Sequence, residues 1–287
     1  MLKLTSERIV KRLRWVMIGA MLFSMVNTLS GQPESFWHHP ETAIRGDGLS
    51  IHDKTNHTFE FYLGNGWPAY VGASVVYLSA AFLAVSVLPG MVALITIFSL
   101  LFGHFFGACN WLAVRWHLGV QGPIVYGIVL SAAVVFSSFP ADGPADPIVK
   151  RLRWVVVGTI LLDLTLTLLG QPSSYWRHPE TVHEANALSR LFLGYGWMAF
   201  LLYDLFYAWA AFQLASILPK MVALVCIFAF IFGHFTGASN WFFYEWRMGM
   251  QAPLIYGATL SVIIVWLAFP PFRERINNFD AAPGPSA

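Results

Sequence analysis

Long apolar stretches dominate the chain, and none of them alternates apolar and polar residues with a period of two. Eight stretches are about 16 to 22 residues long, enough for a helix to cross roughly 30 Å of hydrocarbon. They cover Trp15–Ser30, Trp67–Leu88, Met91–Trp111, Val120–Phe139, Trp154–Leu169, Trp197–Leu218, Met221–Trp241 and Met250–Phe269. The pattern therefore predicts an all-α integral membrane protein with eight transmembrane helices, and it argues against a β-barrel.

The composition supports this class. Of 287 residues, 57% are hydrophobic and only 11% are charged, and the mean hydropathy is +0.60. Average soluble domains are about a quarter charged, and disordered chains are far more polar. The net charge of +2 is too small to indicate nucleic acid as a partner. The lipid bilayer is the partner that these numbers predict, and tryptophans at many span ends are typical of membrane interfaces.

The first half of the chain recurs in the second half. Residues 10–42 share 20 identities in 33 positions with residues 149–181, and residues 63–140 share 37 in 78 with residues 193–270. Sequence motifs return in order, including Gly-Gln-Pro at Gly31 and Gly170 and Gly-His-Phe at Gly103 and Gly233. The sequence therefore predicts a tandem duplication of a four-span unit.

Four spans is an even number, so the second copy enters the membrane with the orientation of the first. We expect two parallel four-helix repeats related by an axis along the membrane normal. The first repeat covers residues 1–140, a cytoplasmic linker covers 141–148 and the second repeat covers 149–270. Residues 271–287 are expected to form a disordered cytoplasmic tail.

Lysine and arginine set the expected orientation. With eight spans, 11 of these residues lie on the side of the two termini and 6 lie on the other side. The positive-inside rule then places both termini in the cytoplasm of a multi-pass protein of the cell membrane.

Four ionisable residues fall inside predicted spans, where charge is costly and by default indicates a functional site. They are His104, Asp163, Asp204 and His234. Each is seven residues from the outer end of its span, so all four are expected roughly 10 Å below the outer interface. In the repeat alignment the histidines match each other, whereas Asp163 matches Ser24 and Asp204 matches Ser74. We therefore predict substrate or proton binding at Ser24, Ser74, His104, Asp163, Asp204 and His234.

Neighbouring residues predict that these groups face protein. Thr159, Asp163 and Thr167 are spaced four apart and form one polar stripe. Glycines four apart, Gly103 with Gly107 and Gly233 with Gly237, let helices approach closely. We expect span 1 to pack near span 5, or span 3 near span 7, at the repeat axis.

The outer loops carry weak candidates for metal ligands. Phe36–Glu41 and Tyr175–Glu180 share Trp, His, Pro and Glu, and histidine and carboxylate are common ligands. A site built from His39, Glu41, His178 and Glu180 requires the two loops to meet. An interfacial tryptophan anchor followed by a proline turn explains the same residues.

Four functions remain open, because no motif identifies a reaction and whether the protein is an enzyme stays uncertain. The first is a carrier or a proton- or cation-linked transporter with an outward-facing polar site. The second is a redox or metal protein, with haem held between His104 and His234 or a metal held by these histidines and the two aspartates. The third is a non-catalytic subunit or assembly factor, either with partners in a membrane complex or as a homo-oligomer. The fourth is a metal-dependent lipid hydrolase that uses the layer of His, Asp and Ser residues.

The eight-span topology predicts which reporter positions are accessible from outside. Single cysteines at Gly143 and Ser286, in a background without the two native cysteines, should resist an impermeant thiol reagent in intact cells. Cysteines at Asp47 and Ala187 should react. Labelling of Gly143 and Ser286 on opposite sides would contradict the model of two parallel repeats.

Overall fold

The computed structural model describes residues 6–44, 57–139, 146–184 and 186–269. All regular elements in these ranges are helical, and they contain no strand. The long helices are α1 (Ser6–Ser30), α3 (Trp67–Val87), α4 (Gly90–Asn110), α5 (Gln121–Ser138), α6 (Asp146–Leu169), α8 (Trp197–Ile217), α9 (Lys220–Asn240) and α10 (Gln251–Ala268). The prediction of an all-α protein is confirmed.

Shorter elements join the long helices. Sequence analysis did not anticipate two of them, α2 (His57–Gly64) and α7 (Ala187–Gly194). Single 3₁₀ turns are η1 (Glu34–Trp37), η2 (Pro40–Thr42) and η4 (Pro179–Thr181), and π-helical turns are η3 (Trp111–Arg115) and η5 (Trp241–Glu245). The predicted linker 141–148 lies partly in residues 140–145, outside the described part, and α6 already begins at Asp146. The predicted tail is also outside the described residues.

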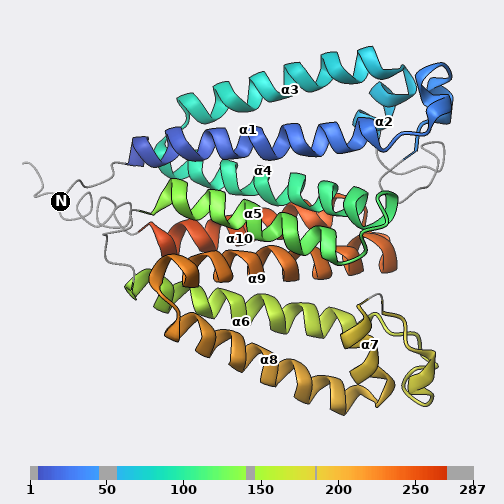
Figure 1. Ribbon diagram of the computed structural model, residues 1–287, viewed down its shortest axis with the longest axis vertical. Helices are drawn as coiled ribbons and strands as arrows, with labels where there is room; N and C mark the ends of the chain where they lie inside the picture. Colours follow the sequence, from blue (N-terminus) through green and yellow to red (C-terminus); the bar gives the residue numbers. More distant parts are fainter. Residues whose placement is uncertain (1–5, 45–56, 140–145, 185, 270–287) are drawn as a thin grey trace, which may run out of the picture.

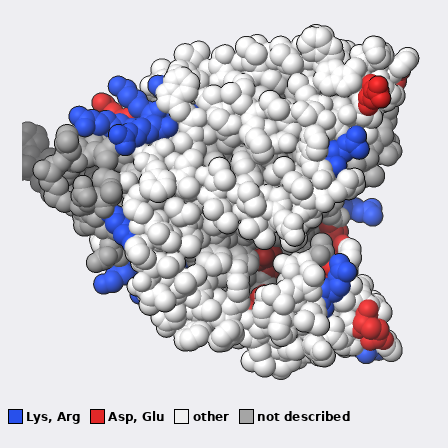
Figure 2. All heavy atoms as spheres, viewed as in Figure 1, with Lys and Arg blue, Asp and Glu red and all other residues white. Residues whose placement is uncertain are grey.

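Seven helices of the described chain are long and apolar enough to cross a membrane: α3, α4 with η3, α5, α6, α8, α9 with η5, and α10. Helix α1 is not among the seven, and its uncharged part, Trp15–Ser30, is 16 residues long. Large apolar side chains such as Val76, Leu83 and Phe206 stand exposed on the surface. Most basic and acidic side chains of the visible face lie toward its two ends, and the surface between them is uncharged apart from acidic atoms inside a hollow (Figure 2). This architecture is that of a polytopic membrane protein.

The long helices lie side by side, with α4, α5, α9 and α10 in the middle (Figure 1). Helices α1 and α3 lie at one side of this central group, and α6 and α8 lie at the other. Helices α2 and α7 lie at the end of the bundle opposite the first turn of α1, and we call it the α2/α7 end.

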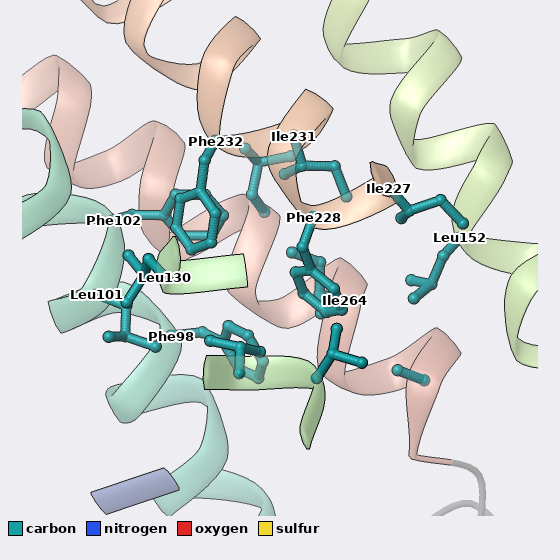
Figure 3. Close-up of a cluster of buried hydrophobic side chains, with 14 of the residues drawn as sticks. Phe98, Leu101, Phe102, Leu130, Leu152, Ile227, Phe228, Ile231, Phe232 and Ile264 are labelled. Atoms are coloured by element: carbon teal, nitrogen blue, oxygen red, sulfur yellow. The ribbon is translucent and has the colours of Figure 1, made fainter. Parts of the chain in front are cut away.

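Phenylalanine rings from α4 and α9 meet in the centre of the core (Figure 3). Phe98 stacks on Phe228 with ring centroids 5.9 Å apart, and the Phe102 and Phe232 centroids are 4.9 Å apart. All four side chains are fully buried. Contact between spans 3 and 7, one of the two arrangements expected from the sequence, is therefore observed.

Helices that correspond in the two halves make corresponding contacts. Helix α4 packs on α1 and α10, and α9 packs on α6 and α5. Helix α3 packs on α1, as α8 packs on α6. The short helices end in the same way, because Gly66 and Gly196 follow α2 and α7 with φ of +94° and +105°. Side chains other than glycine rarely adopt this conformation, so a glycine is required at each turn.

The glycines that follow α1 and α6 permit a second pair of matched contacts. A Cβ atom at Gly31 would overlap the ring of Trp111, and one at Gly170 would overlap the ring of Trp241. These tryptophans begin η3 and η5. The Gly-Gln-Pro motif therefore holds the end of one helix against the π-helical turn of another.

Alanine at Gly170 should destabilise the protein, because the new methyl group has no room beside Trp241. We expect a loss of roughly 1–3 kcal/mol, as for other overpacked sites. Gly158 on α6 is the matched control, because a Cβ there meets nothing within 4 Å. Thermal unfolding of purified Gly170→Ala and Gly158→Ala should show a lower midpoint for the first variant only. Equal midpoints would contradict this packing.

Candidate functional site

A carboxylate and an imidazole meet between α6 and α9. Nδ1 of His234 lies 2.8 Å from Oδ2 of Asp163. An ionised carboxylate only accepts hydrogen bonds, so the imidazole N–H donates. The two side chains are 18% and 20% exposed, so the pair is screened by protein but remains accessible. The predicted polar stripe does face protein, since Thr159 and Thr167 are buried on either side of Asp163.

Gly237 provides the space that Asp163 occupies against α9. A Cβ atom at Gly237 would lie 2.6 Å from Oδ2 and 2.7 Å from Oδ1 of Asp163. At Gly107, the matching position in the first half, a Cβ would lie at an ordinary 3.4 Å from Oγ of Ser24. The same helix contact thus accommodates a carboxylate in one half and a hydroxyl in the other.

Asp204 and two tyrosines complete this site. Asp204 on α8 is buried and interacts electrostatically with His234 and Asp163. The Tyr207 ring lies 5.6 Å from the His234 ring, measured between centroids. Tyr256 on α10 interacts electrostatically with Asp163, and its hydroxyl is buried with no hydrogen-bond partner. We call Asp163, Asp204, Tyr207, His234 and Tyr256 the second-half cluster.

The corresponding residues of the first half form a separate group without acids. His104 on α4 faces Tyr77 on α3, with ring centroids 5.8 Å apart. Ser24 and Ser74 are both buried, the first beside Gly107 on α4 and the second beside Tyr70 on α3. The six predicted site residues therefore lie in two groups, Ser24, Ser74 and His104 in one and Asp163, Asp204 and His234 in the other.

The two histidines do not meet, because helix geometry turns them away from the axis. Each histidine follows a core phenylalanine by two residues, His104 after Phe102 and His234 after Phe232. Two residues are about 200° of rotation around a helix, so a phenylalanine that faces the partner helix leaves its histidine facing away. Phe102 and Phe232 face each other between α4 and α9 (Figure 3). A haem held between His104 and His234 does not fit this arrangement.

The two histidine-bearing loops also remain apart. Nδ1 of His39 lies 3.1 Å from Oε1 of Glu41, and His178 and Glu180 form the same pair at 3.1 Å. Each pair stays within its own loop, and the loops lie at opposite sides of the molecule (Figure 1). Across the described ranges, no three histidine, cysteine, aspartate or glutamate side chains are placed to hold a metal ion. The shared metal site would need the loops to meet, and they do not.

The α2/α7 end differs in charge between the halves. Arg115 at the end of η3 donates from Nε to the Gly31 carbonyl at 2.6 Å. Glu245 occupies the matching place at the end of η5 and cannot donate. Its Oε2 instead lies 3.5 Å from Nδ1 of His183. Glu184, next to His183, interacts electrostatically with Asp204.

A hollow opens on this side of the molecule. Figure 2 shows it between the α6–α8 side and the outer part of α9 and α10, with acidic atoms inside and both acidic and basic atoms around its rim. Carboxylates in such a place can bind a proton or a cation, and imidazole can exchange protons near neutral pH. The second-half cluster can therefore bind positive charge in a protein-lined space.

A groove between α1 and α5 is chemically different. It has a volume of about 670 Å³ and is lined almost entirely by apolar side chains, including Val16, Phe23 and Val129. None of the predicted site residues lines it. Its surface suits hydrocarbon and offers no charge to a polar ligand.

Sequence analysis missed several residues of the site. Tyr207 could have been found, because Tyr77 matches it and each tyrosine follows the Ser74 or Asp204 position by three residues. The exchange of Arg115 for Glu245 was also visible in the alignment. Gly237 was noted only for helix packing, and its role beneath Asp163 depends on the rotation of α6 against α9.

No protein-family model, curated protein or solved structure matches this chain.

Two glycines one turn apart on α9 should respond very differently to alanine. Gly237→Ala displaces the Asp163 carboxylate and should separate it from His234, whereas a Cβ at Gly233 meets nothing within 4 Å. We expect the His234 ring signals in NMR spectra to shift in Gly237→Ala, because the ring loses its carboxylate partner. Gly233→Ala should match the parent protein, and identical His234 ring signals in all three proteins would contradict the assigned contact.

Proposed function

We propose that the protein is a carrier that exchanges protons for a cation at the second-half cluster. The proposal includes an eight-span topology in which α1 joins the seven apolar helices, two parallel repeats, and termini in the cytoplasm. The α2/α7 end and its hollow would then face outward. Matched helix contacts in the two halves support the duplication, and the 11 to 6 distribution of Lys and Arg supports the orientation.

The charge of the cluster is the observation that carries the proposal. With both carboxylates ionised, Asp163, Asp204 and His234 sum to −1 when the imidazole is protonated and to −2 when it is neutral. Asp204 also interacts electrostatically with Glu184, which is a further acid. Negative charge is expensive at this depth. A proton or a bound cation supplies the missing positive charge.

Competition for the same carboxylates gives a mechanism for exchange. Loss of a proton creates the negative charge that binds the cation, and binding of a proton releases it. His234 can take part, because its Nδ1 contacts Asp163 directly and an imidazole ring can both donate and accept a proton. Each ligand is then bound in a site of nearly constant total charge.

The first half supports the structure without binding charge. It has Ser24 and Ser74 where the second half has Asp163 and Asp204, and it has Arg115 in place of Glu245. The scaffold therefore folds with serine at the first two positions. The first half has the same helix contacts without acids at these two positions. Binding therefore explains the two acids of the second half more readily than packing does.

Serine at either acid should abolish exchange while the protein still folds. Serine forms hydrogen bonds but carries no charge, and His234 can become neutral when its partner is removed. Proteoliposomes that contain a pH-sensitive dye should report proton flux when NaCl, KCl or a quaternary ammonium chloride is added outside. We expect flux with at least one cation, and a reduction of more than tenfold in Asp163→Ser and Asp204→Ser.

Ser24→Ala and Ser74→Ala are the matched controls, and they should retain the flux of the parent protein. Gel filtration and the thermal midpoint of each variant check that it is folded. Unchanged flux in both aspartate variants would show that the acids are incidental. No flux with any cation in the parent protein would reject the carrier and favour a subunit role.

A further inference from the structure

A row of aromatic rings leads from α7 to the second-half cluster. Phe192 on α7 stacks on Tyr203 with centroids 4.2 Å apart and planes 9° apart. The Tyr203 and Tyr207 centroids are 6.2 Å apart, and Tyr207 lies 5.6 Å from His234. The first contact is tight and covers one face of Tyr203. Tyr207 also meets the Phe230 ring edge-on, with centroids 5.9 Å apart, so the row is held from α7, α8 and α9 and ends beside His234.

The row and the acids are specific to the second half. Tyr62 and Tyr77 match Phe192 and Tyr207, but Ala73 stands where the row has Tyr203. The next residue is Ser74 in the first half and Asp204 in the second. The central ring and the adjacent acid are therefore present together in one half and absent together from the other.

Aromatic faces and carboxylates are the two groups that bind alkylated ammonium ions in water-poor sites. A cation within about 6 Å of a ring centroid is attracted by the ring, and a carboxylate balances its charge. In the described ranges no three potential metal ligands converge. The surroundings of Asp204 thus suit a broad, soft cation better than a small ion that needs closely spaced oxygen ligands.

Two acids of the second half lie toward the α2/α7 end. Glu184, whose carbonyl accepts a hydrogen bond from Arg190, interacts electrostatically with Asp204. Glu245 lies beside His183, whose ring meets the Trp241 ring edge-on. Ile44 takes the place of His183 in the first half, since Gln32 binds its backbone as Gln171 binds that of His183. Acidic groups along an approach raise the local concentration of cations.

We propose that the cation bound at the second-half cluster is an organic ammonium ion. The rings of Tyr203 and Tyr207 lie on one side of it, and the carboxylates of Asp163 and Asp204 lie on the other. This assignment rests on the proposed function and narrows its ligand class. The ring faces contact the alkyl groups, and the carboxylates lie on the side of His234.

Direct binding to the purified protein tests the ligand class without a transport assay. Isothermal titration in detergent would use tetramethylammonium and choline chlorides, with NaCl at the same ionic strength as the reference. We expect saturable binding of an ammonium ion. Tyr207→Leu should weaken it about tenfold, because the ring attraction is lost, and Tyr207→Phe should change it less than threefold. Asp204→Asn should weaken it more than tenfold.

Tyr77→Leu, the matched change in the first half, should leave binding unchanged. Weakening by Tyr77→Leu equal to that by Tyr207→Leu would overturn the location. Equal binding by the Leu and Phe variants at Tyr207 would overturn the role of the ring. Proton flux driven by Na⁺ or K⁺ with no ammonium binding would overturn the ligand class while the carrier stands. If the folded Asp163→Ser and Asp204→Ser variants keep full proton flux while the parent protein still binds an ammonium ion, the proposed carrier site is wrong. The effects of the Tyr207 variants on binding then decide whether the ammonium ion lies where we propose.

Discussion

The contact between α4 and α9 decides in which direction His104 and His234 face. Phe98 and Phe102 of α4 fill the space against Phe228 and Phe232 of α9, and these rings are fully buried. Rings of this size bury large apolar areas and fix the rotation of both helices. Because His104 and His234 lie about 200° around from their phenylalanines, the apolar contact directs each histidine outward, toward its own half.

That outward direction produces two similar groups of side chains rather than one central site. Each has a histidine and a tyrosine, from α4 and α3 in one half and from α9 and α8 in the other. What separates them is a few substitutions at matched places, chiefly Ser24 to Asp163 and Ser74 to Asp204. The backbone contact that tolerates serine beside Gly107 also accepts a carboxylate beside Gly237. The two halves thus differ in hydroxyl against carboxylate at matched positions, while the helix contacts around these positions stay alike.

The difference extends from the cluster to the surface. Arg115 is used to hold the Gly31 carbonyl, and this contact ties η3 to the end of α1. Glu245 cannot make it, so the equivalent region of the second half places an acid beside His183. The same half has the deeper acids and the central aromatic ring. The substitutions near the surface and in the interior therefore both add acidic groups to the second half.

Much of this was determined by the sequence alone. The apolar stretches predicted every long helix, because span length and hydrophobicity are local properties of the chain. The polar stripe around Asp163 predicted an inward face, since helical spacing places residues four apart on one side. Only the tertiary structure decided which groups meet. Asp163 meets His234 and Glu245 meets His183, whereas His104 and His234 do not meet. These pairings depend on how far each helix is rotated in its packing, and that rotation is set by side chains on several helices at once.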